Sequence, residues 1–129
     1  MLRYRIAFAS ALLLLFAFVV KPIVAAEESK AVKTIAGILM TVNHFPNDDQ
    51  KKTLTALEAE STTTAQEKVL IQAMLGMQHS ISAADKPKVE EVMKDSKAPE
   101  GVKTIAGILD KFLHTASPAD KETLKKLSM

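Results

Sequence analysis

A 35-residue repeat constrains this chain more than any other feature of its sequence. Residues 32–57 and 102–127 align without a gap at an offset of 70, and 13 of the 26 positions are identical. Eight of these identities form one continuous block, VKTIAGIL. A third and more diverged copy, 67–92, lies at half that offset. A fixed period of this length is typical of folds built by repeating one supersecondary unit.

Apolar residues recur in register in all three copies. Seven columns are apolar throughout: Ile35/Leu70/Ile105, Ala36/Ile71/Ala106, Ile38/Ala73/Ile108, Leu39/Met74/Leu109, Val42/Met77/Phe112, Leu54/Val89/Leu124 and Leu57/Val92/Leu127. The first five columns have the spacing of a helix with a wide apolar stripe, which indicates an inner helix that packs against several neighbours. The last two are three residues apart on a polar segment, which predicts an outer helix with a narrow buried edge. Each copy is therefore predicted to be a helical hairpin.

Polar residues mark where the helices of each hairpin begin. The pairs Asn47/Gln50, Ser82/Asp85 and Ser117/Asp120 resemble capping boxes at the start of the outer helix, and Thr64/Glu67 marks the inner helix of the middle copy. No strand pattern competes with this reading. The predicted fold is all-α: three 35-residue helical hairpins, at about 29–61, 62–96 and 97–129, forming a small α-α bundle or a short superhelical stack. They make up a single domain, 27–129.

The first 26 residues have the pattern of a secretory signal peptide. Arg3 and Arg5 precede the apolar stretch 6–20, and small residues end the segment at Ala26. The apolar stretch is shorter than the ~20 residues that a spanning helix needs, so we expect membrane contact only before cleavage. The chain is predicted to be exported, to a bacterial periplasm or the extracellular space. Because it contains no cysteine, it lacks the disulfides usual in small secreted eukaryotic domains, which favours the periplasm.

Composition argues against several functions. After residue 26 the chain has no arginine, and its 14 lysines are interspersed with 15 acidic residues, so we expect no nucleic-acid partner. No catalytic motif and no glycine-rich phosphate loop occurs, so the chain is predicted not to be an enzyme and to need no cofactor. Lys51, Lys86 and Lys121 recur in the repeat and are interpreted as a solvated face.

Each copy carries one histidine at the same place, and His44, His79 and His114 are the only histidines of the chain. One interpretation is structural: each side chain would bond the free carbonyls at the end of the inner helix, or bridge to the next helix cap. A pH-responsive role is another. The third is a metal site, which requires the three imidazoles to converge. An open stack would hold them ~8–10 Å apart per step, so only a closed, pseudo-threefold arrangement of the hairpins allows a shared site.

Two further patterns have a functional and a structural interpretation. Met74 and Met77, with His79, could form a soft copper(I) cluster, but both occupy apolar columns and are predicted to be core residues. Gly37 and Gly107 lie inside inner helices, where they suggest a close helix crossing. The sequence therefore predicts a non-catalytic interaction or structural module with a protein partner, and the alternative is a periplasmic metal-binding protein that uses the three histidines.

Overall fold

A computed structural model describes residues 27–129, which form six helices joined by short turns. The inner helices are α1 (Lys30–Thr41), α3 (Ala65–Leu75) and α5 (Glu100–Lys111), and each is followed by an outer helix. The outer helices are α2 (Asp48–Ala59), α4 (Lys86–Lys94) and α6 (Pro118–Ser128). The all-α class is confirmed. The predicted signal peptide, 1–26, lies outside the described residues.

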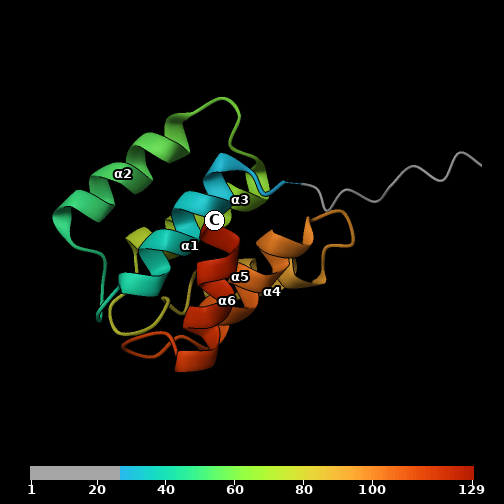
Figure 1. Ribbon diagram of the computed structural model, residues 1–129. Coiled ribbons are helices and arrows are strands. Elements are labelled where there is room, and N and C mark those ends of the chain that lie inside the picture. The colour runs from blue at the N-terminus through green and yellow to red at the C-terminus, as the bar shows by residue number, and fades with distance from the viewer. Residues whose placement is uncertain (1–26) are drawn as a thin grey trace, which may run out of the picture.

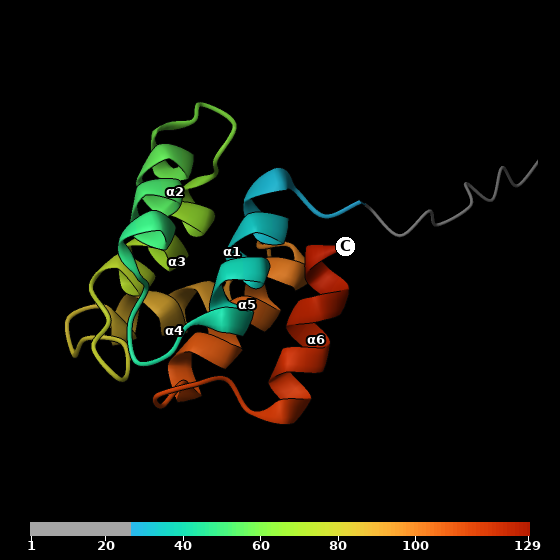
Figure 2. The same ribbon diagram turned by 60° about the vertical axis from the view of Figure 1, so that its left-hand side comes forward.

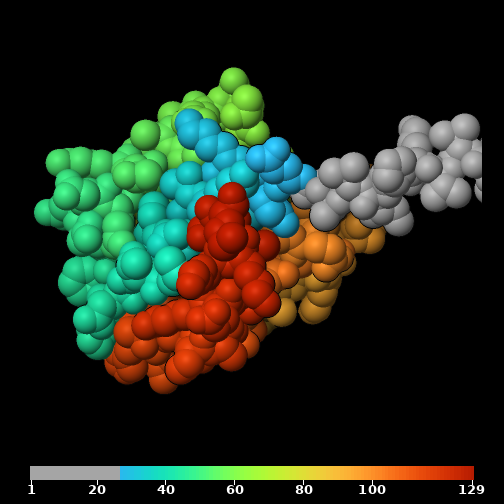
Figure 3. All heavy atoms as spheres, viewed as in Figure 1, coloured from blue at the N-terminus to red at the C-terminus, as the bar shows by residue number. Residues whose placement is uncertain are grey.

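The three hairpins form a closed ring. The inner helices contact one another in the middle, and each outer helix packs against the inner helix of the next hairpin: α2 on α3, and α4 on α5. The last outer helix, α6, packs against the first inner helix, α1, in both ribbon views (Figures 1 and 2). In the space-filling view the red C-terminal segment lies directly against the blue and cyan N-terminal segment (Figure 3). The helices therefore form a closed bundle, and not an open stack.

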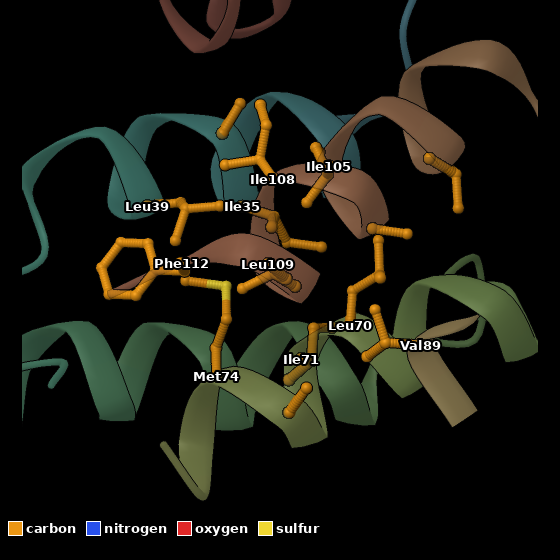
Figure 4. Close-up of a cluster of buried hydrophobic side chains, with 14 of the residues drawn as sticks. Ile35, Leu39, Leu70, Ile71, Met74, Val89, Ile105, Ile108, Leu109 and Phe112 are labelled. Carbon is orange, nitrogen blue, oxygen red and sulfur yellow. The ribbon is translucent and has the colours of Figure 1, made fainter. Parts of the chain in front are cut away.

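The seven apolar columns supply the core. Ile35, Leu70 and Ile105 are fully buried, as are the three residues of the Leu39 column. Figure 4 shows such side chains, including Leu39, Met74 and Leu109, meeting between the inner helices. Only Ile38 and Leu127 are partly exposed among all the members of the seven columns.

Three of the four predicted helix starts are confirmed and one is wrong. Asn47 and Thr64 form complete capping boxes, and Ser117 caps α6. Helix α4 begins at Lys86, three residues later than its capping signal predicts, because Pro87 cannot donate an interior helical hydrogen bond and is accepted only in a first turn. The predicted contact at Ser82 does form, since its hydroxyl accepts the Asp85 N–H, but Ser82 begins a turn in which its carbonyl also accepts the N–H groups of Asp85 and Lys86.

The inner helices present their N-termini at one end of the bundle and the predicted site residues at the other. At the N-terminal end Glu67 is 2% exposed, and its carboxylate accepts hydrogen bonds from the Thr64 N–H and the Ser29 hydroxyl. The helix N-termini favour this buried negative charge. Within residues 27–129 no helix has the length and apolarity to cross a membrane.

Candidate metal centre

The three histidines stand at the tips of the three turns that join the inner helices to the outer helices. Each is flanked two residues away, on both sides, by a buried residue that anchors the turn: Val42 and Pro46, Met77 and Ile81, Phe112 and Ala116. His44, His79 and His114 have φ angles of 67°, 65° and 63°, and they are the non-glycine residues with positive φ in the described chain. This conformation strains an L-residue and is commonest for glycine; among the other residues asparagine, aspartate and histidine adopt it most often.

Backbone hydrogen bonds join the three tips into a closed ring. The N–H of His44 donates to the carbonyl of His114 at 2.6 Å, that of His79 to His44 at 2.7 Å, and that of His114 to His79 at 2.6 Å. Each histidine therefore donates to one of the others and accepts from the remaining one. The ring brings residues 35 and 70 positions apart together, and it fixes where the three Cβ atoms point.

The imidazoles converge on one point. Their Nδ1 atoms are 2.9, 3.0 and 3.1 Å apart, and their ring centroids lie 4.8–5.0 Å from each other. The ring planes meet at 70–79°, which is a T-shaped and not a stacked arrangement. A hydrogen bond needs a proton on one nitrogen and a lone pair on the other. No distribution of protons over three mutually close nitrogens makes all three contacts hydrogen bonds, so protons alone leave the group unsatisfied.

A metal ion would satisfy all three nitrogens at once. At a bond length of ~2.0–2.1 Å, an ion bound by Nδ1 atoms this far apart has N–metal–N angles of about 90–100°. Those angles suit one face of an octahedron. The tetrahedral angle of zinc requires the nitrogens to separate by only about 0.3 Å. The three nitrogens therefore fit a first-row divalent ion, with at least one coordination position left over.

The three imidazoles face solvent, and their neighbours in the chain carry no charge. His44 is half-buried, and His79 and His114 are exposed, so the site faces solvent. The residues on either side of each histidine carry no charge: Asn43, Phe45, Gln78, Ser80, Leu113 and Thr115. No carboxylate belongs to the group of potential ligands within residues 27–129. Phe45 and Leu113 are large apolar residues that remain 52% and 62% exposed at this end of the bundle.

The structure thus brings all three predicted ligands together. The wide separation expected of an open stack does not occur, because the ring of hairpins is closed. The helix-capping interpretation of the histidines is wrong: they lie beyond the ends of the inner helices, and their side-chain hydrogen-bonding contacts are with one another.

Other candidate residues are placed differently. Met74 and Met77 are buried in the core, as predicted, and offer no copper cluster. The recurring lysines do not act alike: Lys51 lies over the Phe45 ring, at 5.7 Å from its centroid, whereas Lys86 lies 3.7 Å from Asp110. The sequence analysis did not single out Phe45, although its position next to a repeated histidine was visible in the sequence.

Comparison with protein-family models, curated proteins and solved structures finds no match for this chain.

Proposed function

We propose that this chain is an exported protein that binds one divalent transition-metal ion through His44, His79 and His114. The observation that carries the proposal is the approach of three Nδ1 atoms to within 3.1 Å of one another. Three imidazoles with an open position are a common ligand set for zinc, and imidazole also suits copper, nickel and iron. Export is supported by the charged and apolar pattern of the first 26 residues.

Backbone strain supports a role for the imidazole side chains themselves. A non-glycine residue held at positive φ costs about 1–3 kcal/mol, and strain of this kind gathers at functional sites. Here three such residues occur at equivalent places, and all three are histidine. A turn with only a structural role would be formed at lower cost by glycine.

The metal interpretation is preferred to a purely structural module because the histidines contact each other and not the helix ends. A non-catalytic interaction role with a protein partner stays a prediction, and so does the lack of catalysis. Metal binding is compatible with both, since a metal site can serve storage, delivery or recognition.

Isothermal titration calorimetry with Zn²⁺, Cu²⁺ and Ni²⁺ tests the proposal. We expect a stoichiometry of one ion per chain for at least one of these metals. His79→Asn should abolish that binding, because asparagine tolerates positive φ and keeps the turn while it removes the imidazole. The matched control Gln78→Ala, at the exposed neighbouring position, should bind like the parent. A variant without His79 that binds as tightly as the parent would contradict the proposal.

A further inference from the structure

A metal ion held by these three histidines would keep its full positive charge. Imidazole is a neutral donor, and neither the ligand group nor the residues flanking each histidine contribute a carboxylate. Three protein ligands leave at least one coordination position free, and the exposure of His79 and His114 opens that position to solvent. A divalent ion in this state attracts a small anion in place of a neutral water molecule.

A depression next to the site offers room for the body of such an anion. It has a volume of about 420 Å³ and lies between the first and second turns, with His79 in its wall. Phe45, Leu75 and Met77 give it apolar lining, and Lys51 contributes an ammonium group.

The lysine of this depression differs from its two repeat equivalents. Lys86 approaches Asp110 at 3.7 Å. Lys121, like Lys51, forms no ion pair within residues 27–129, but it is exposed on the outer helix α6 and does not lie over an aromatic ring of the described chain. Lys51 forms no ion pair with any residue of 27–129 and lies over the face of Phe45. One wall of the site therefore combines a potential metal ligand, a free ammonium group and apolar surface.

We propose that the metal-loaded site binds a small organic carboxylate. One carboxylate oxygen coordinates the ion in place of a water molecule, and the apolar body lies in the depression against Phe45, with Lys51 near the negative charge. Water leaves as the carboxylate arrives, so the net charge of the centre falls from 2+ to 1+ and no covalent bond of the ligand breaks. The inference rests on the proposed metal function and names the class of ligand that the metal would present or carry.

The test uses protein loaded with one equivalent of Co²⁺, whose visible absorption changes when an inner ligand changes. Acetate and benzoate are titrated separately, with inorganic phosphate as a third probe. We expect both carboxylates to perturb the spectrum and benzoate to bind about tenfold more tightly than acetate, since its ring buries apolar surface in the depression.

Two matched pairs of variants assign the binding surface. Phe45→Ser should remove most of the preference for benzoate. Leu113→Ser, which changes another exposed apolar residue that lies outside the depression, should keep it. Lys51→Gln should weaken both carboxylates about threefold, and Lys121→Gln should not.

The outcomes separate the inference from the proposed function. If Co²⁺ binds but no carboxylate changes its spectrum, the carboxylate inference is overturned and metal binding stands. If phosphate binds as tightly as benzoate, or if Leu113→Ser acts like Phe45→Ser, the assignment to the depression is overturned. If no metal binds to the parent chain, the proposed function itself has failed.

Discussion

Replacing His44, His79 and His114 together by glycine separates a ligand role from a structural role. In metal-free buffer the substitution relieves the backbone strain of three residues held at φ of 63–67°, and each relief stabilises the folded state by about 1 kcal/mol or more. Against this gain, each glycine adds about 0.5–1 kcal/mol of unfolded-state entropy. The substitution also removes three close nitrogen contacts that cannot all be hydrogen bonds. We therefore expect the free energy of unfolding of the triple variant to lie within about 1 kcal/mol of the parent or above it.

The same substitution should have a large effect when metal is present. An ion at 100 times its dissociation constant stabilises the native parent by about 2.7 kcal/mol, and the triple glycine variant gains nothing. For a domain of this size that difference raises Tm by about 10–20 °C. The control Gln78→Gly, which makes a neighbouring exposed residue equally flexible, should keep the full metal response.

Denaturant unfolding in chelator, and thermal unfolding with and without Zn²⁺, Cu²⁺ or Ni²⁺, measure these effects. Two results would refute the reasoning. A loss of more than about 3 kcal/mol by the triple variant in chelator would show that the imidazoles hold the fold together. An equal metal-induced Tm shift in the parent and the triple variant would place the metal elsewhere.

Three further predictions concern the scaffold. Gly107→Ala should raise the free energy of unfolding by about 0.5–1 kcal/mol in denaturant melts, because alanine favours the helix and the added methyl group would lie 3.9 Å from its nearest neighbour, an ordinary contact distance. A loss of stability would show that the packing of α5 against its neighbouring helix needs glycine at this position. Glu67→Ala should lower the free energy of unfolding by about 2–3 kcal/mol, since it removes a capping box and the partly buried hydrogen bond that joins Ser29, the N-cap of α1, to α3; an unchanged stability would contradict this role of the carboxylate. The pKa of Asp95 is held below its ordinary value of 3.8 by hydrogen bonds from the Lys97 N–H and the Gln66 amide, so its contribution to stability is present above that value and is lost as pH falls through the lowered pKa. A carboxyl titration followed by NMR should give a midpoint below 3.8, and a midpoint at or above it would disprove those contacts.

The helices and the core were predictable because they depend on local patterns. Columns such as Ile35/Leu70/Ile105 specify which face of each helix is buried, and this face is the same whether the hairpins form a closed bundle or an open stack. The late start of α4 was not predicted, since the capping signal at Ser82 was given more weight than Pro87.

The sequence did not decide whether the three hairpins close into a bundle, because a wide apolar stripe suits a closed bundle and an open stack equally. One signal did favour closure. An open array needs a terminal unit with a polar outer face, yet the last outer helix keeps Leu124 in the same apolar column as Leu54. In the structure Leu124 is fully buried and α6 lies on α1.

The meeting of the histidines follows from that closure and could not be predicted without it. A period of 35 residues establishes that the three turns are equivalent, but the distance between them depends on how far each hairpin rotates from the last. Positive φ at His44, His79 and His114 was not predicted either, since glycine, its strongest sequence marker, is absent from those positions. The burial of Glu67 had a clearer signal in the sequence, because its equivalents in the other two copies, Val32 and Val102, are apolar.

X-ray absorption spectroscopy of the protein with one equivalent of Zn²⁺ tests the central claim most directly. We expect a first shell with three imidazole nitrogens at ~2.0–2.1 Å and one or more oxygen ligands, and we expect the imidazole scattering to be lost in the triple glycine variant. A first shell of oxygen donors alone, or one with a single imidazole, would show that the three histidines do not share an ion.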